Sequence, residues 1–193
     1  MGVKIGWERL AEPARAVSRR AGADSVSATT DPGCVIGHKF RIVRRLGSGA
    51  MGEVFLAQQD LLGRQVAIKV LRPSLASDPA MVEQFQREAV AASTIRHPNV
   101  ALVYDFGGFE NTLFLAMEYV DGQSLGVTLR RHGRLQVGDA LEIAERVASA
   151  LEAAHAHGVL HRDIKPHNVL LGTGPEGLRV KVVDFGIAKL LDR

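Results

Sequence analysis

Three polar side chains with complementary chemistry lie within a span of six residues. Asp163 carries a carboxylate, Lys165 an amine and Asn168 an amide, all within the segment 161–168. The carboxylate can accept a hydroxyl proton, the amine can neutralise a phosphate oxygen, and the amide oxygen can ligate a metal ion. This set of groups is suited to phosphoryl transfer, although alone it is only a modest indication.

A glycine-rich segment provides a second group of candidates. Gly47, Gly49 and Gly52 are spaced as in a phosphate-binding turn, where glycine lets the backbone N–H groups approach phosphate oxygens. Because a strand and not a helix is expected to follow, the segment differs from a dinucleotide-binding fingerprint. For an isolated match, a plain hairpin turn is the better interpretation.

Three further charged residues stand on elements that could aim them at a phosphate. Lys69 alternates with apolar neighbours and therefore faces one side of a predicted strand. Glu88 lies in the following predicted helix, from which its carboxylate could reach Lys69. Asp184 ends a buried strand, where a carboxylate can hold Mg²⁺ with Asn168 as a second ligand. The ordinary alternatives are a lysine that keeps a strand edge soluble, a solvated helix carboxylate and a simple turn.

The elements around these residues form a small sheet followed by helices. Alternation and turn residues predict five strands, at 40–46, 53–58, 65–71, 100–106 and 112–120. Asp78 and Pro79 open a helix that runs to about residue 95, because Asp caps and Pro starts helices well. Helices are then expected at 124–131 and 137–157, and short strands at 169–171 and 180–183. The fold class is therefore α+β.

Composition excludes several classes of protein. The chain has 193 residues, 46% hydrophobic and 23% charged, with a net charge of only +3. This composition is typical of a globular protein, and without a Lys/Arg block it gives no indication of nucleic-acid binding. Cys34 is the only cysteine, so an intrachain disulfide is impossible. No apolar run approaches the ~18 residues of a membrane span, so we expect neither secretion nor a membrane anchor, and a cytoplasmic location.

The motifs, in this order and spacing, resemble the protein kinase fold. The resemblance is greatest to bacterial serine/threonine protein kinases, and it is carried by segments 46–54 (Leu-Gly-Ser-Gly-Ala-Met-Gly-Glu-Val), 161–168 (His-Arg-Asp-Ile-Lys-Pro-His-Asn) and 184–189 (Asp-Phe-Gly-Ile-Ala-Lys). It covers residues 38–193 and implies an N-lobe at 38–120, with a five-stranded antiparallel sheet and one helix. A partial, mostly helical C-lobe is expected at 121–193, and a disordered extension at 1–37.

The resemblance implies roles for the phosphate-binding and catalytic residues, with ATP and Mg²⁺ as cofactors. Three glycines would cover the ATP phosphates, namely Gly47, Gly49 and Gly52. Lys69 would hold the α- and β-phosphates and pair with Glu88. Asp163 would be the catalytic base, or at least orient the hydroxyl, and Lys165 would contact the γ-phosphate. Two side chains would bind Mg²⁺, namely Asn168 and Asp184. Lys165, two residues after Asp163, favours serine or threonine over tyrosine as the acceptor.

The same resemblance implies an adenine site. Three apolar side chains would enclose the ring, namely Val54, Ala67 and Leu170, for which ordinary core positions are the alternative. Met117 would be the gatekeeper, and the backbone groups of Glu118 and Val120 would bind the adenine edge. Leu46 belongs to the same ATP-binding set.

The chain also departs from the kinase pattern. Only seven residues follow Gly186, so no activation loop or Ala-Pro-Glu motif is present in it. The helix 137–157 is expected to lack packing partners, at about 1.5–3 kcal/mol for each large apolar side chain left uncovered. We therefore expect the chain to be unstable alone or to need another chain. The leading hypothesis is a serine/threonine kinase core with protein substrates. The alternatives are a truncated ATP-binding module without turnover, an inactive fragment or a small-molecule phosphotransferase.

Overall fold

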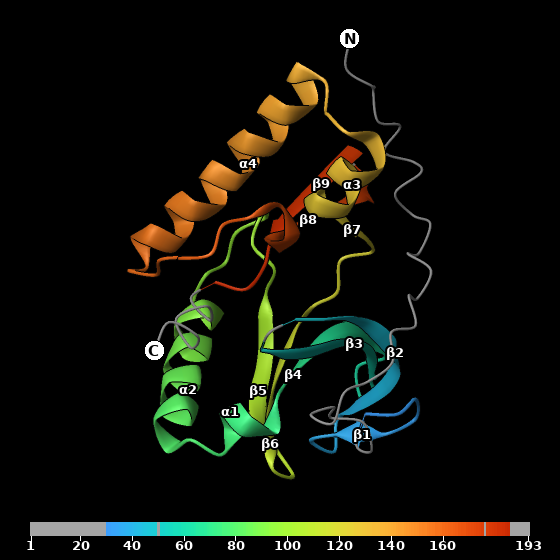
Figure 1. Ribbon diagram of the computed structural model, residues 1–193, viewed down its shortest axis with the longest axis vertical. Coiled ribbons are helices and arrows are strands. Elements are labelled where there is room, and N and C mark those ends of the chain that lie inside the picture. Colours follow the sequence, from blue (N-terminus) through green and yellow to red (C-terminus); the bar gives the residue numbers. More distant parts are fainter. Residues whose placement is uncertain (1–29, 50, 176, 186–193) are drawn as a thin grey trace. The chain divides into compact units, whose positions relative to one another are not determined.

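The computed structural model describes residues 30–49, 51–175 and 177–185, which form two compact units (Figure 1). The sheet unit comprises residues 30–90 and 102–119, and the loop unit comprises residues 91–101 and 120–185. Residues 1–29 of the predicted extension, and residues 186–189 of the third motif, lie outside the described residues. Each unit is described separately.

The sheet unit is built on six antiparallel strands in the order β1-β2-β3-β4-β6-β5. Their bounds are β1 (Val35–Ile36), β2 (Phe40–Ser48), β3 (Gly52–Gln59), β4 (Arg64–Leu71), β5 (Val103–Phe109) and β6 (Thr112–Glu118). Between β4 and β5 come α1 (Pro73–Ala76) and α2 (Pro79–Ser93). Residue 100, the expected start of the fourth predicted strand, lies outside β5, and α1 was not predicted.

The sixth strand corrects the predicted count of five. β1 lies in residues that were assigned to the extension, and Ile36 is completely buried. Gly37, with φ of 57°, turns the chain from β1 towards β2, and a Cβ there would approach the Phe114 ring to 3.0 Å. A two-residue strand gives no periodic signal, so the pairing could not be read from the sequence.

One face of the sheet carries the hydrophobic core of this unit. Phe40 and Phe114 pack edge to face, with their ring centroids 5.8 Å apart. The buried cluster has members from five of the six strands, namely Ile36, Phe40, Ile42, Phe55, Ala57, Val66, Ile68, Val70, Phe114 and Ala116. Ile68 and Val70 belong to it, so Lys69, between them on β4, faces the other side of the sheet.

The loop unit combines a three-stranded sheet with helices. Its antiparallel strands are β7 (Gly122–Ser124), β8 (Val169–Gly174) and β9 (Gly177–Val182), and its helices are α3 (Leu125–His132), α4 (Val137–Ala156) and the 3₁₀ helix η2 (Pro166–Asn168). Ser124 caps α3 by accepting a hydrogen bond from the Val127 N–H, and Gly133 ends the helix at φ of 76°. This mixture of helices and antiparallel strands agrees with the predicted α+β class.

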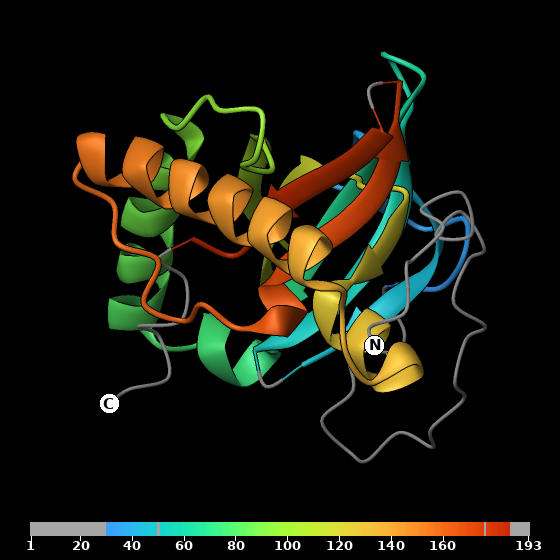
Figure 2. The ribbon, with the colours of Figure 1, turned by 90° about the horizontal axis from the view of Figure 1, so that it is seen from above.

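α4 lies across β8 and β9, as Figure 2 shows from above. Its inner side contributes Ile143 and Val147 to a small core with β8 and β9. The outer side is exposed, with 76% of Val137 and 65% of Leu141 accessible to solvent. None of the helices in the described part of the chain is long and apolar enough to cross a membrane.

The segment that follows α2 is fastened to this unit by backbone and side-chain hydrogen bonds. The Asn99 amide donates to the Val180 carbonyl at 3.0 Å, and the Ala101 N–H donates to the Val182 carbonyl at 3.0 Å. His97 Nε2 lies 3.1 Å from the Ser149 hydroxyl on α4. Residues 97–101 therefore hold the end of β9, two residues before Asp184.

Candidate active site

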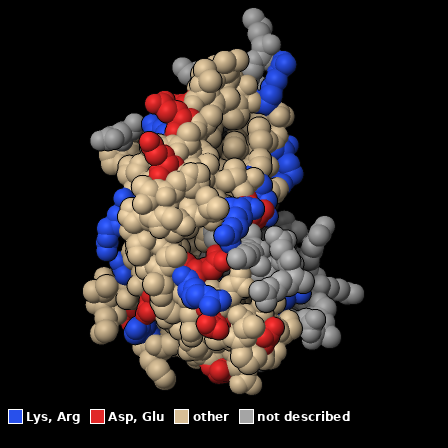
Figure 3. Space-filling model, turned by 90° about the vertical axis from the view of Figure 1, so that its left-hand side faces the viewer, with Lys and Arg blue, Asp and Glu red and all other residues tan. Residues whose placement is uncertain are grey.

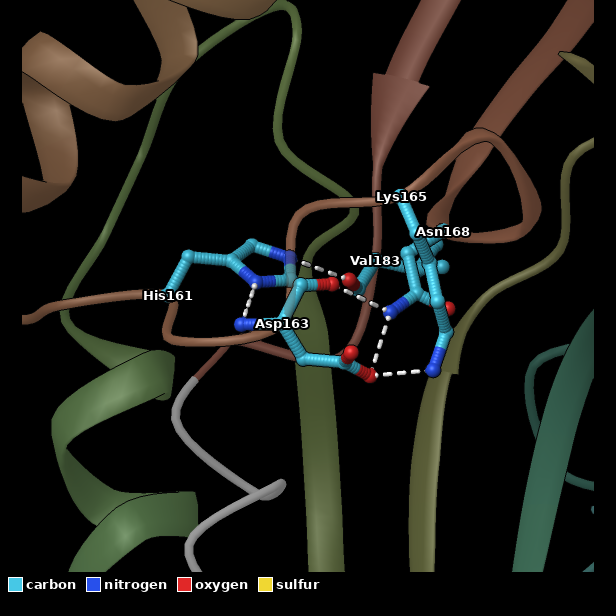
Figure 4. A network of polar contacts seen from close by, with 5 residues as sticks. All are labelled: His161, Asp163, Lys165, Asn168 and Val183. Atoms are coloured by element: carbon cyan, nitrogen blue, oxygen red, sulfur yellow. Dashed lines mark hydrogen bonds and ion pairs between the residues drawn. The ribbon is translucent and has the colours of Figure 1, made fainter.

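Asp163 is the centre of a network of polar contacts in the loop unit (Figure 4). Its Oδ2 accepts hydrogen bonds from Lys165 Nζ at 2.5 Å and from Asn168 Nδ2 at 3.1 Å. Asn168 Nδ2 also donates to the Asp163 carbonyl at 2.9 Å. Because both hydrogens of the Asn168 amide point to Asp163, the amide oxygen is the atom that remains for a metal ion. The structure thus brings the three residues of the first motif together.

The environment keeps the Asp163 carboxylate ionised. The hydrogen bond from Lys165 is the largest effect and lowers the pKa of Asp163. Burial raises this pKa by less, and the hydrogen bond from Asn168 lowers it further. The Asp163 side chain is 35% exposed, so a substrate hydroxyl can reach it. An ionised, accessible carboxylate can accept a proton or orient a hydroxyl at neutral pH.

His161 supports this network through two hydrogen bonds, a role that the sequence did not indicate. It is 2% exposed, and burial lowers its pKa, so the imidazole is neutral near pH 7. Nε2 donates to the Val183 carbonyl at 2.9 Å, and Nδ1 accepts from the Asp163 N–H at 3.3 Å. The ring also packs on Phe185, with centroids 4.7 Å apart. His161 therefore joins the loop of Asp163 to the segment of Asp184.

Two residues at this site have left-handed backbones. Arg162 has φ of 63° and Asp184 has φ of 64°, in a region that costs a non-glycine residue of the order of 1–3 kcal/mol. Arg162 immediately precedes Asp163, and Asp184 is itself a predicted metal ligand. Such conformations persist where neighbouring contacts enforce them, and here His161 contacts both segments.

In the sheet unit, the predicted adenine and phosphate residues share one face. The strand register pairs Val54 with Lys69, Lys69 with Leu115, and Ala67 with Met117. Residues opposite each other in an antiparallel pair, and residues two apart in a strand, lie on the same side. These side chains therefore lie on the face opposite the hydrophobic core, where a nucleotide could contact them.

The glycine segment forms the turn between β2 and β3. The Gly49 N–H donates to the Gly52 carbonyl at 2.8 Å, and Arg72 Nη2 donates to the Gly49 carbonyl at 3.3 Å. A Cβ on Gly52 would lie 1.9 Å from the Val70 carbonyl oxygen, whereas a Cβ on Gly47 would meet nothing within 4 Å. Gly52 is therefore required by strand packing, and Gly47 is not. Leu46, 37% exposed, lies at a shift in the β2–β3 register.

Lys69 and Glu88 are both placed in the sheet unit. Lys69 is 6% exposed on β4, and Glu88 lies on α2, where its carboxylate is 3.5 Å from the Gln84 amide nitrogen. A lysine buried to this degree is more than a solubilising edge residue. The ion pair between Lys69 and Glu88 stays a prediction.

The remaining predicted residues lie in or just after strands: Glu118 ends β6, Val120 follows it, and Leu170 lies in β8. The Glu118 N–H donates to the Leu102 carbonyl at 2.8 Å, and the Glu118 carboxylate accepts from the Leu102 N–H at 3.2 Å. Val120 is buried in the loop unit. Leu170 lies on β8 between Val169 and Leu171, both in the core, so Leu170 faces the opposite side.

The described residues contain no group of three or more His, Cys, Asp or Glu that could hold a metal ion. The predicted metal ligands are instead one carboxylate and one amide, Asp184 and Asn168, oxygen donors of the kind that Mg²⁺ accepts. A hollow along α4, lined by residues such as Ser149, Leu151 and His155, contains none of the predicted site residues. On the face in Figure 3, Lys and Arg are interspersed with Asp and Glu rather than gathered into one basic field.

Comparison with known families identifies the fold. The family model described as "Protein kinase domain" matches residues 40–193. The serine/threonine-protein kinase PknA of Mycobacterium tuberculosis (strain H37Rv) is 42% identical over 165 residues, covering 83% of this chain and 38% of PknA. The serine/threonine-protein kinase pkn3 of Myxococcus xanthus is 48% identical over 162 residues, covering 83% of this chain and 30% of pkn3.

A solved structure gives the same result. The crystal structure of the M. tuberculosis PknI kinase domain has a TM-score of 0.72 and 40% sequence identity, covering 81% of this chain and 62% of that domain. The chain spans 38% or less of the length of the first curated relatives that it matches. The predicted resemblance to bacterial serine/threonine kinases is confirmed. With this match over most of its length, the chain belongs to the protein kinase domain family.

Proposed function

We propose that this chain is the catalytic core of a serine/threonine protein kinase, which transfers the γ-phosphoryl group of ATP to serine or threonine hydroxyls of proteins. The observation that carries this proposal is the Asp163 carboxylate, ionised and fixed by Lys165 and Asn168. Residues 38–120 would be the small lobe, and 121–193 the beginning of the large lobe. Use of ATP is consistent with the cytoplasmic location that the sequence predicts.

The chemical step assigns a task to each polar group of the loop. The hydroxyl oxygen of the substrate forms a bond to the γ-phosphorus, while the bond from that phosphorus to the bridging oxygen of ADP breaks. The hydroxyl proton passes to the Asp163 carboxylate, and ADP leaves with the electron pair. Lys165, held beside Asp163 at 2.5 Å, neutralises charge that develops on the transferred group.

The donor set fits a bound Mg²⁺. The Asn168 amide oxygen and the Asp184 carboxylate would hold the ion, together with phosphate oxygens of ATP. Bound Mg²⁺ would neutralise phosphate charge. The contribution of the chain is to fix these two ligands, through the Asn168 hydrogen bonds to Asp163 and through the left-handed backbone of Asp184.

The sheet unit supplies most of the proposed nucleotide-binding residues, and the loop unit supplies Val120 and Leu170. Gly47, Gly49 and Gly52 would present backbone N–H groups to the phosphates, and Lys69, oriented by Glu88, would bind the α- and β-phosphates. Four apolar side chains would contact the adenine or its entrance, namely Leu46, Val54, Ala67 and Leu170. Met117, Glu118 and Val120 would line the edge of the ring. The shared face of Val54, Ala67, Lys69 and Met117 supports this assignment.

The direct test is transfer of radiolabel from γ-labelled ATP to a mixture of serine-, threonine- and tyrosine-containing peptides. We expect Mg²⁺-dependent label on serine or threonine, lost in Asp184→Asn. Asp60→Asn is the matched control, because Asp60 is a surface carboxylate paired with Arg41. Label on tyrosine alone would contradict the acceptor assignment. Mg-ATP binding without transfer would support an ATP-binding module.

A further inference from the structure

α3 ends in a basic turn beside the Asp163 loop. Its last turn contains Arg130, Arg131 and His132, and no acidic residue occurs in Leu125–His132. Arg130 extends to η2, where its Nη1 lies 2.8 Å from Nε2 of His167. Because a guanidinium can only donate, His167 Nε2 is the acceptor of this hydrogen bond.

The position of His167 is defined by two residues of α3. A Cβ on Gly126 would lie 3.0 Å from the nearest carbon of the His167 ring, so the imidazole packs directly on the helix backbone. Gly126 and Arg130 are one helical turn apart and therefore lie on the same face of α3. The His167 ring is thus positioned by packing on Gly126 and by its hydrogen bond with Arg130.

This pair lies next to the groups that would perform the reaction. His167 directly precedes Asn168, whose amide holds Asp163, and it is two residues from Lys165. Arg130 and His167 are both exposed. A polypeptide that presents a hydroxyl to Asp163 would therefore pass close to both side chains.

Among the described residues, no carboxylate pairs with the charge of Arg130. Several arginines elsewhere in the chain pair with carboxylates, as Arg41 does with Asp60 and Arg146 does with Glu142. Within the ranges that the structure describes, Arg130 forms no ion pair, and its hydrogen bond goes to the ring nitrogen of His167. The remaining N–H groups of its guanidinium have the geometry to bind a carboxylate or phosphate in a bidentate manner.

We propose that Arg130 and His167 form a docking position for an anionic side chain of the protein substrate, close to the accepting serine or threonine. The anion is a carboxylate of Asp or Glu, or the phosphate of a residue that is already phosphorylated. The inference rests on the proposed phosphoryl transfer, and it adds which substrates the same site prefers.

The test uses the whole chain with Mg-ATP and a series of serine peptides. Each peptide carries glutamate, phosphoserine, alanine or lysine at one position flanking an acceptor serine, and KM and kcat are measured separately. At one flanking position we expect KM for the glutamate peptide to be about fivefold below that of the alanine peptide. Phosphoserine is compared with glutamate at that position, and the lower KM identifies the anion that is preferred.

Variants assign the effect to the pair. Arg130→Ala should bring the ratio of the two KM values close to one, and Arg130→Glu should transfer the preference to the lysine peptide. Arg131→Ala is the matched control, since adjacent helix residues point about 100° apart. Arg131 carries the same charge as Arg130 in the same turn, and the Arg131→Ala variant should retain the ratio of the two KM values. The proposal would be overturned if Arg130→Ala and Arg131→Ala lost the preference for the glutamate peptide equally. It would also be overturned if the wild-type chain had equal KM values for all peptides.

A binding measurement separates this inference from the proposed function. Fluorescent peptides with alanine in place of the acceptor serine are titrated with the chain, and anisotropy reports binding without transfer. Tighter binding of the glutamate peptide, lost in Arg130→Ala but not in Arg131→Ala, would support the docking position even if no label is transferred. Equal affinities for peptides with different flanking charges would reject the docking position, whatever the catalytic result.

Discussion

The two groups of site residues are held in place by different means. On the sheet, Val54, Ala67 and Lys69 take their positions from strand pairing, with a packed core on the opposite face. In the loop, Asp163 and its neighbours lie mostly outside regular structure and are fixed by contacts with one another and with His161. Changes to the sheet should therefore appear first as lost stability, and changes to the loop first as lost activity.

The largest effect is expected at a glycine of the sheet. Gly52→Ala would place a Cβ 1.9 Å from the Val70 carbonyl oxygen, and we expect a loss of about 3 kcal/mol in the free energy of unfolding. Gly47→Ala is the matched control, because nothing lies within 4 Å of its Cβ, and it should retain the unfolding midpoint. Denaturant titration measures both. Equal midpoints for the two variants would show that the glycine turn is not built as described.

A comparable loss of stability is expected at the base of the loop. His161→Phe retains a ring against Phe185 but removes the partners of the Val183 carbonyl and the Asp163 N–H, at about 1–3 kcal/mol for each buried group. His132→Phe, on the exposed end of α3, should change stability little. Thermal unfolding of both variants makes the comparison.

The wild-type chain should show the same dependence on His161 as a function of pH. Burial lowers the pKa of His161 below its ordinary value of 6.5, so the folded state binds this proton less readily than the unfolded state. The associated stability is fully present above pH 6.5 and is lost as the pH falls towards the folded pKa. The loss should be absent in His161→Phe, and an unchanged acid slope in that variant would contradict the assignment.

The pH dependence of transfer should depend on Lys165. Because the hydrogen bond from Lys165 is the largest cause of the lowered pKa of Asp163, Lys165→Ala should raise that pKa. The acidic limb of the kcat/KM profile should then move to higher pH, since the carboxylate must be ionised to accept the proton. Rates measured across acidic buffers test this. A limb that moves to lower pH would mean that another group controls it.

The smallest effect is expected where a side chain of the sheet unit touches the glycine turn. Arg72→Ala removes the 3.3 Å hydrogen bond to the Gly49 carbonyl, and we expect KM for ATP to rise about two- to threefold, as for a weak, exposed hydrogen bond. Arg87→Ala removes an exposed arginine paired with Glu83 on α2 and should leave KM unchanged. Equal KM values for Arg72→Ala and the wild type would show that Arg72 does not support the glycine turn.

The sequence predicted the parts that follow from local patterns. Alternation predicted that Lys69 faces away from Ile68 and Val70, and the core confirms it. Aspartate and proline predicted that α2 begins at Pro79, and the structure confirms it. The motif order predicted the family, which the comparison confirms.

The remaining features depend on contacts between segments that are distant in the chain. β1 is too short for a periodic signal and is defined by pairing with β2. The buried role of His161 arises from its contacts with Val183 and Phe185, more than twenty residues away. Arg72 reaches the glycine turn only because β3 and β4 pair. Spacing alone does not reveal contacts of this kind.

The most direct measurement is a rapid-quench transfer experiment on Asp163→Asn, together with titration of Mg-ATP binding. We expect transfer to a serine peptide to fall by about 10²–10⁴-fold, the usual contribution of a positioned general base. Binding of Mg-ATP should stay close to that of the wild type. Transfer at the wild-type rate, with Mg-ATP still bound, would contradict the assignment of Asp163 as the group that receives the hydroxyl proton.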